Sequence, residues 1–302
     1  SDAAALPLAS TLPCTKLLAV QVNYPSSYSI LTASTILTYY SHADVPIGAI
    51  RPFNDSIFTD THYYQYGDYA SKVQHHWNAS LTDADDAWDP VDLYRKVLSE
   101  QDDRSVIIAS IGFFDNLSGL LNSTADRYPR LDGPELVASK VNELVIMGGA
   151  YPSGWEYNFG GGSPALTAHV ISTWPGKMTF SGSYLGGNIT SAAPLSVQAP
   201  STDPVAAAYK WYIGYNIPFY SWDPITLLYA IQGLDNFFEY GNSYGYNSVN
   251  ASDGSNAWVN DTSVTNQHWI VLKDGVTNTT LGSVLDNLYL SGAFRTWVNN
   301  VA

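Results

Sequence analysis

Two polar side chains, Glu156 and Asn158, have the types and spacing needed to hold neighbouring hydroxyls of a sugar. They follow an apolar run, residues 144–147, that ends at Gly148-Gly149. An apolar run stopped by paired glycines predicts a buried strand and then a tight turn. Side chains beyond the carboxyl end of such a strand lie where open α/β sheets bind ligands, and residues i and i+2 of extended backbone point the same way. The alternative is that both residues are loop polars that face water.

Two aspartates occupy positions typical of helix starts. Ser1 or Asp2 is expected to cap a helix at the beginning of the sequence, and Asp223 precedes a proline, as N-cap residues often do. Trp222, next to Asp223, is compatible with an aromatic residue of the hydrophobic core. Taken singly, these residues require no function beyond folding.

The composition indicates a globular, acidic protein. The chain has 302 residues, 45% of them hydrophobic and only 13% charged, with a net charge of −14. This length suits one large α/β domain or two small ones. Because no internal repeat and no Pro/Ser linker occurs, we expect a single domain over residues 1–302. A chain this acidic is repelled by phosphate backbones, so nucleic-acid polymers are not expected partners. No apolar run of about 18 residues occurs, so no membrane span is expected.

The glycosylation motifs favour a secreted protein. Cys14 is the single cysteine, so no intrachain disulfide is expected, which by itself suggests a reducing compartment. Asn-x-Ser/Thr motifs point the other way, although such motifs also arise by chance in chains rich in Ser, Thr and Asn. A further motif begins at Asn116, which also suits an N-capping turn. The expected acceptors are Asn54, Asn78, Asn122, Asn188, Asn250, Asn260 and Asn278.

The pattern along the chain predicts alternating strands and helices, which indicates an α/β fold with an open, mostly parallel central sheet and helices on both faces. Residues 53–89 are long, aromatic and without a period, which is typical of a lid or binding loop. Strands are expected at residues 17–22, 44–49, 105–110, 144–147, 177–180 and 268–273, and helices at 29–40, 90–98, 165–171, 205–213, 226–231 and 281–301.

The stretch MGGAYPSGWEYNF, residues 147–159, resembles the MGG…EFN signature of the inosine-uridine-preferring nucleoside hydrolases. Three further stretches are similar to that family: residues 44–49, the turn after residues 105–110, and the Trp222-Asp223-Pro224 step. Members of the family are calcium-dependent and cleave the N-glycosidic bond of ribonucleosides. The segment Phe159–Pro164 departs from the family, which has an Asp-Pro-Glu step there.

The resemblance implies a role for each matching residue. Asn23, Glu156 and Asn158 would hold the ribose, although Asn23 also suits an ordinary turn. Trp222 would stack on the base, as tryptophan does in purine-preferring members, and it cannot protonate the base because its indole does not titrate. The implied calcium ligands are Asp2, the carbonyl of Ser110 and Asp223.

The resemblance also implies a strand and an aspartate-rich loop, with the general-base aspartate, upstream of Ser1, which itself stands where the family has a further aspartate. The expected function is calcium-dependent hydrolysis of ribonucleosides, purine-leaning, by a secreted enzyme. The family often forms dimers or tetramers, so the resemblance allows a homo-oligomer. Two alternatives remain: a catalytically silent protein that binds a nucleoside or sugar on the same fold, and a secreted interaction or storage glycoprotein whose fold is incidental.

Overall fold

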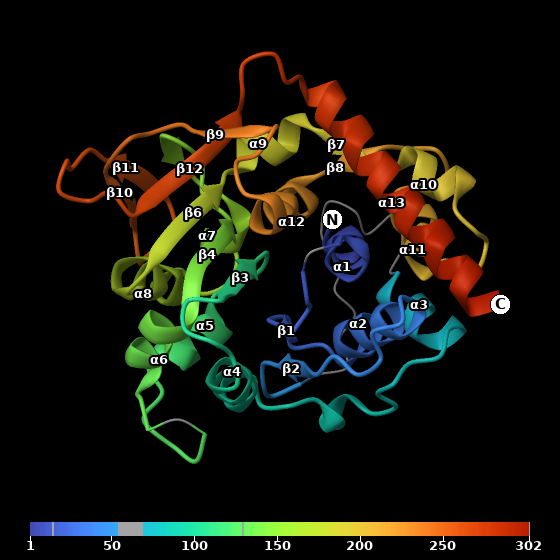
Figure 1. Ribbon diagram of the computed structural model, residues 1–302, viewed down its shortest axis with the longest axis horizontal. Helices are drawn as coiled ribbons and strands as arrows, with labels where there is room; N and C mark the ends of the chain where they lie inside the picture. The colour runs from blue at the N-terminus through green and yellow to red at the C-terminus, as the bar shows by residue number, and fades with distance from the viewer. Residues whose placement is uncertain (14, 54–68, 129, 302) are drawn as a thin grey trace. The chain divides into compact units, whose positions relative to one another are not determined.

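The computed structural model describes residues 1–13, 15–53, 69–128 and 130–301 (Figure 1). The chain divides into two compact units. Unit 1 comprises Ser1–Trp88, Ile189–Pro224 and Thr277–Ala302, and unit 2 comprises Asp89–Asn188 and Ile225–Val276. The single domain expected from the sequence stays a prediction.

Unit 1 is mainly helical. Its helices pack on one another, and α1 lies against both α2 and α13. Two short parallel strands, β1 and β2, pair over three residues, and β7 pairs antiparallel with β8. Its elements are α1 (Asp2–Thr11), β1 (Val20–Val22), α2 (Ser27–Tyr39), β2 (Ile47–Ala49), α3 (Ala70–His76), η1 (Ala84–Asp86), β7 (Thr190–Ser191), α10 (Ala193–Gln198), α11 (Pro204–Tyr212), β8 (Phe219–Tyr220) and α13 (Asn278–Val301).

Unit 2 is built on a five-stranded sheet of order β3-β4-β6-β12-β9, in which only β9 is antiparallel to its neighbour. A second, antiparallel sheet has the order β10-β11-β5. Its elements are α4 (Pro90–Ser99), β3 (Val106–Ser110), α5 (Asp115–Leu121), α6 (Gly133–Lys140), β4 (Val141–Met147), β5 (Ser153–Gly154), α7 (Tyr157–Gly160), α8 (Pro164–Thr173), β6 (Lys177–Ser181), α9 (Ser183–Asn188), β9 (Phe238–Tyr240), β10 (Tyr246–Val249), β11 (Asn256–Val259) and β12 (Gln267–Leu272). Helix α12 (Trp222–Gln232) begins in unit 1 and continues into unit 2.

Strand β4 is buried on both faces, which explains its continuous apolar sequence. In Figure 1 helices α5, α6 and α8 lie on one side of the sheet and the body of α12 on the other. Helix α12 is tied to the sheet by the hydroxyl of Tyr229, which donates to the Glu143 carboxylate at 3.0 Å. Thr179 of β6 donates to the same oxygen at 2.5 Å. The mostly parallel sheet covered by helices on both faces is therefore confirmed.

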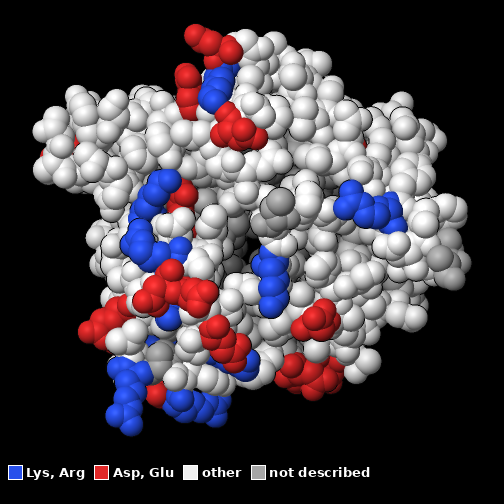
Figure 2. Space-filling view, in the orientation of Figure 1, with Lys and Arg blue, Asp and Glu red and all other residues white. Residues whose placement is uncertain are grey.

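The surface carries few charged side chains, as Figure 2 shows for one face of the molecule. Among the described residues, no helix is both long and apolar enough to cross a membrane.

Candidate functional site

In unit 1 the start of the chain contacts the start of α12. The hydroxyl of Ser1 donates a hydrogen bond to the carboxylate of Asp223. Ser1 is the N-cap residue of α1, as expected, but its side chain makes no capping hydrogen bond. Asp223 lies within the first turn of α12 rather than at its N-cap, and only 4% of it is exposed. Residues 222 positions apart in the sequence therefore share one hydrogen bond.

Asp2 lies next to this contact, and its side chain is 68% exposed. Burial raises the pKa of the Tyr209 hydroxyl well above its ordinary value, and the charges of Asp223 and Asp2 add to that rise. Two carboxylates act on one buried phenol, so both lie within electrostatic range of it. The structure thus brings the two predicted metal-binding aspartates to the same region of unit 1.

Trp222 is part of a chain of aromatic rings. Its ring centroid lies 4.7 Å from that of Tyr220 and 6.1 Å from that of Phe219. Tyr212 contacts Phe219 edge-on at 6.0 Å, and Tyr69 contacts Tyr212 at 5.6 Å. A partly exposed ring series of this kind can stack on a planar ligand.

The remaining predicted residue of unit 1, Asn23, lies just beyond the carboxyl end of β1. The lid expected at residues 53–89 contains a helix, α3, that the sequence pattern did not predict. Residues 54–68 of this expected lid, with the Asn54 acceptor, lie outside the described residues.

In unit 2, Ser110, Glu156 and Asn158 lie at or beyond the carboxyl ends of two neighbouring strands. Ser110 is the last residue of β3 and is paired in register with Ile146 of β4. The turn after β4 begins at Gly148-Gly149, where Gly149 adopts a φ of +77°. Parallel neighbours end at the same edge of the sheet, so all three residues lie at the edge where open α/β sheets bind ligands.

The Glu156 carboxylate is buried and receives backbone hydrogen bonds. Asn158 N donates to it at 2.9 Å, and Phe159 N and Gly149 N donate at 3.3 Å each. Burial raises the pKa of Glu156 to about 7, although these hydrogen bonds favour the charged form. Near neutral pH the group is therefore present both as an acceptor and as an O–H donor, and either form can bind a sugar hydroxyl.

Asn158 differs from the sequence expectation. Glu156 is the N-cap of α7, and Asn158 lies within that helix rather than in extended backbone. The side-chain amide of Asn158 donates to the carbonyl of Met147 at 3.1 Å, so it ties α7 to the end of β4. The extended geometry assumed for the pair was wrong, because the Glu156 carboxylate starts a helical turn at Tyr157.

One positioning residue gave no signal in the sequence. The side chain of Asn256, on β11, accepts from Ala150 N at 2.8 Å and donates to Ala150 O at 3.0 Å. It thereby satisfies both backbone groups of a residue in the turn after β4. More than 100 residues separate the two, so no local pattern could reveal the contact.

The part of the chain that the structure describes contains no cluster of three or more His, Cys, Asp or Glu residues placed to hold a metal ion. The predicted calcium ligands, two carboxylates and a backbone carbonyl, are not a cluster of that kind. Their oxygen atoms are the ligand type that calcium prefers, so the donor chemistry fits the ion.

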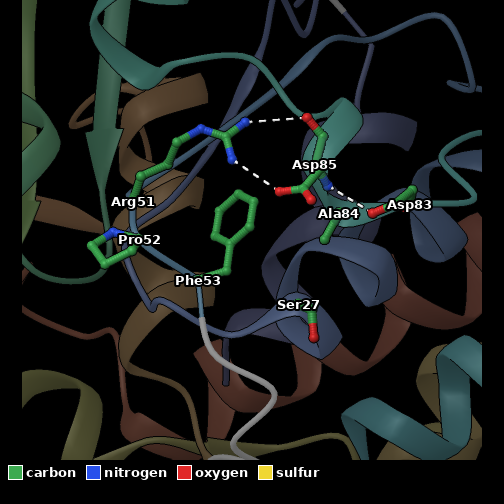
Figure 3. Close-up of a pocket in the computed structure, with 7 residues that line it drawn as sticks. All are labelled: Ser27, Arg51, Pro52, Phe53, Asp83, Ala84 and Asp85. Carbon is green, nitrogen blue, oxygen red and sulfur yellow. Dashed lines mark hydrogen bonds and ion pairs between the residues drawn. The ribbon is translucent and has the colours of Figure 1, made fainter.

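A separate hollow of about 630 Å³ in unit 1 does not coincide with the predicted site (Figure 3). The Arg51 guanidinium donates to Ala87 O at 2.7 Å, pairs with Asp85 at 3.5 Å and lies 4.3 Å from the Phe53 ring centroid. Its charge is thus used within the protein. The hollow is lined by Ser27, Arg51, Pro52, Phe53, Asp83, Ala84 and Asp85.

The fold matches those of solved nucleoside hydrolases, although no family model and no curated protein sequence matches the chain. A plant nucleoside hydrolase is 17% identical with a TM-score of 0.72, over 96% of this chain and 95% of that one. A purine-preferring ribonucleoside hydrolase from Gardnerella vaginalis is 15% identical with a TM-score of 0.71, over 98% and 95%. An inosine-uridine-preferring nucleoside hydrolase from Bacillus anthracis is 13% identical with a TM-score of 0.64, over 98% and 94%. The chain therefore has the fold of these proteins.

Proposed function

We propose that this protein hydrolyses the N-glycosidic bond of ribonucleosides, with a preference for purines, to give ribose and the free base. The observation that supports this most is the fold, shared with nucleoside hydrolases over nearly the full length of both chains. One fold can host many functions, so the residues must supply the rest of the argument.

The proposed substrate contacts come from residues at the ends of strands and at a helix start. Asn23, Glu156 and Asn158 hold the ribose hydroxyls, and Trp222 stacks on the base. The neighbouring Tyr220 ring supports this role of Trp222, since contact at 4.7 Å restrains the indole before ligand binds. The preference for purines follows from stacking, because a two-ring base offers more surface to an indole than a pyrimidine does.

Calcium is the proposed cofactor, with Asp2, the Ser110 carbonyl and Asp223 as ligands. The ion would supply a hard Lewis acid that favours deprotonation of water at neutral pH. The burial of Asp223 and its bond to Ser1 support a fixed ligand, because a held carboxylate loses little freedom on binding. None of the residues named here is proposed as the general base.

The test measures release of base from inosine, adenosine and uridine with calcium and with a chelator. We expect chelator-sensitive turnover, faster with the two purine nucleosides. The variant Asp223→Asn should lower kcat/KM by about 10- to 100-fold or more, the range typical when a contact that supports a metal is lost. The matched control is Asp89→Asn, at another Asp-Pro helix start where Asn serves equally well as a cap. Equal activity of the two variants would contradict the proposed role of Asp223.

The second candidate is a silent binding protein on the same fold. It is favoured by Ser1, which offers a hydroxyl where the family has an aspartate. Calorimetry would measure binding of a nucleoside or ribose, and a separate assay would follow release of base over hours. Binding without release would support the silent binding protein in place of the enzyme. If neither binding nor turnover is observed, only an interaction or storage role remains.

Secretion as a glycoprotein is also proposed. All six predicted acceptors that the structure describes are exposed, namely Asn78, Asn122, Asn188, Asn250, Asn260 and Asn278. Asn116 is 2% exposed in α5, so the folded protein has no room for a glycan on this side chain. After expression through a secretory pathway, peptide N-glycosidase should lower the mass and leave the peptide with Asn116 unchanged. An unchanged mass would contradict the proposal.

A further inference from the structure

The turn after β4 is held by a hairpin that comes much later in the chain. Strands β10 and β11 pair antiparallel, and β11 also pairs with β5, which follows the turn. The hairpin carries two buried asparagines, Asn247 and Asn256, each 4% exposed. Burying a side-chain amide costs free energy unless its donors and acceptors are paired. Their hydrogen-bond partners therefore indicate which contacts the fold maintains at this place.

The two asparagines are linked to the turn by an unbroken series of hydrogen bonds. The Asn256 amide, which binds both backbone groups of Ala150, also donates to Asn247 Oδ1 at 3.0 Å. The Asn247 amide donates to the Tyr151 hydroxyl at 3.0 Å, and that hydroxyl donates to Gly148 O at 3.2 Å. The turn is thus held at two residues that flank a single glycine.

That glycine, Gly149, binds the Glu156 carboxylate. Its N–H donates to Glu156 Oε2 at 3.3 Å, and its carbonyl accepts from Ser183 N at 2.8 Å. The Gly149 N–H and the Gly148 carbonyl belong to one planar peptide group, so a hydrogen bond that fixes the carbonyl also fixes the direction of the N–H. The Tyr151 hydroxyl and the Glu156 carboxylate therefore bind the two ends of the same peptide group.

The Tyr151 side chain is itself fixed in place. Its ring stacks on Trp269 of β12 at 5.6 Å with an interplanar angle of 8°, and contacts Phe180 of β6 at 5.6 Å. Burial raises the pKa of the Tyr151 hydroxyl well above its ordinary value, and the charge of Glu156 adds to that rise. The hydroxyl therefore stays protonated, and able to donate to Gly148 O, over the pH range in which Glu156 titrates.

We propose that Asn247 and Tyr151 are positioning residues for the ribose-binding carboxylate. They hold the peptide group whose N–H keeps Glu156 in place, and so act on the sugar through Glu156. This role rests on the proposed function for its ligand, ribose, whereas the hydrogen bonding of Glu156 can be tested without a ligand. If the hairpin only stabilised the fold, loss of the Tyr151 hydroxyl would lower stability without changing Glu156.

The test compares Tyr151→Phe with Tyr229→Phe. The first variant keeps the stacked ring and removes only the hydroxyl between Asn247 and Gly148. The second removes a buried hydroxyl of unit 2 that donates to Glu143, outside the turn after β4. It is the matched control for a loss of stability alone.

The ionisation of Glu156 is the first measurement, by carbon NMR of carboxyl-labelled glutamate, with its signal assigned as the one absent from Glu156→Gln. Burial raises this pKa, and hydrogen bonds from the backbone N–H groups of residues 149, 157, 158 and 159 lower it. Tyr151→Phe should therefore move the titration midpoint to higher pH, whereas Tyr229→Phe should not move it. Asn247→Ala should act in the same direction, and the double variant should show less than the sum because both changes act through one hydroxyl.

Binding of ribose, measured by calorimetry, is the second readout. We expect Tyr151→Phe to weaken it about fivefold, which corresponds to the loss of one ordinary hydrogen bond, and Tyr229→Phe to bind as the wild type does.

An unchanged Glu156 midpoint in both Tyr151→Phe and Asn247→Ala would overturn the proposal, even in a protein that binds ribose. An equal shift in Tyr229→Phe would also overturn it, because the shift would then reflect general loosening. A shift confined to the Tyr151 and Asn247 variants supports the positioning role, even if no nucleoside is hydrolysed. Failure of this role and failure of the proposed function therefore give different results.

Discussion

Asp89, Asp203 and Asp223 each precede a proline, yet their carboxylates have different partners. Asp89 is exposed and accepts from two backbone N–H groups at the start of α4. Asp203 is fully buried, caps α11 in the same way, and also accepts from the Tyr40 hydroxyl at 2.7 Å. Asp223 accepts from the Ser1 hydroxyl. The same dipeptide thus serves as a surface cap, a buried cap and a contact at the candidate site.

The two caps should differ in their contribution to stability. Asp89→Ala removes an exposed cap and should lower the free energy of unfolding by about 1 kcal/mol. Asp203→Ala also leaves the buried Tyr40 hydroxyl without its acceptor, so it should cost about 3 kcal/mol. Urea unfolding of both variants checks this. Equal losses would mean that the Tyr40 hydroxyl finds another partner.

Glu156 should make stability depend on pH. Its pKa is raised from 4.5 to about 7, so the folded protein holds a proton that the unfolded chain releases between these values. Stability from this group is full below pH 4.5 and is lost as pH rises through 7, by about 3 kcal/mol in total. Burial raises the pKa of Asp203 as well, so the wild type alone does not isolate Glu156.

The comparison with Glu156→Gln isolates it. Urea unfolding at pH 5 and pH 8 should show a larger loss of stability for the wild type than for the variant, because glutamine does not titrate. Parallel losses in the two proteins would mean that Glu156 ionises at its ordinary pKa in the folded state.

At the scale of elements, the turn after β4 depends on Gly149. Gly149 has a φ of +77°, and a Cβ there would lie 2.8 Å from Tyr151 Oη and 3.0 Å from the Phe159 ring. Gly275 has a similar φ of +86° but no atom within 4 Å of an added Cβ. Gly275→Ala should therefore lower the free energy of unfolding only through backbone strain, by about 1 kcal/mol. Gly149→Ala adds steric overlap and should lower it by about 3 kcal/mol. Thermal unfolding of the pair measures the difference, and equal costs would show that the turn has room to relax.

The elements most visible in the sequence have clear ends or continuous apolar runs. Strand β4 and helices α4 and α11 lie where they were expected, because apolar runs are bounded by glycine, proline or aspartate. Helix α3 was missed, since Val73 is its one buried residue and no apolar period marks it. Strand β1 is shorter than predicted because only Val20–Val22 pair with β2.

The geometry of the candidate site was less predictable than its residues. The sequence pattern put Ser110 at the end of its strand and Glu156 and Asn158 after theirs. It did not predict α7, because glutamate is an uncommon N-cap and signals no helix start. The contact between Ser1 and Asp223 and the support from Asn256 join residues far apart in the chain.

At the scale of the whole molecule, net charge should oppose folding. There are 27 acidic and 13 basic side chains, and several ion pairs of the described residues are largely exposed, as at Arg51–Asp85 and Arg127–Asp92. Exposed pairs contribute little, whereas repulsion between unpaired carboxylates is long-ranged at low salt. The tight pair of Arg95 with Asp126, at 2.6 Å, differs from these because Arg95 is buried.

Raising NaCl from 10 to 300 mM should therefore raise the melting temperature, since the screening length falls from about 30 Å to well under 10 Å. Arg95→Met should lower the melting temperature at both salt concentrations by a similar amount, because a pair this buried is screened little. Calcium chloride at matched ionic strength separates screening from binding: an added rise that disappears in Asp223→Asn indicates a bound ion. A melting temperature that falls with NaCl would mean that ion pairs outweigh repulsion, contrary to the charge balance of the chain.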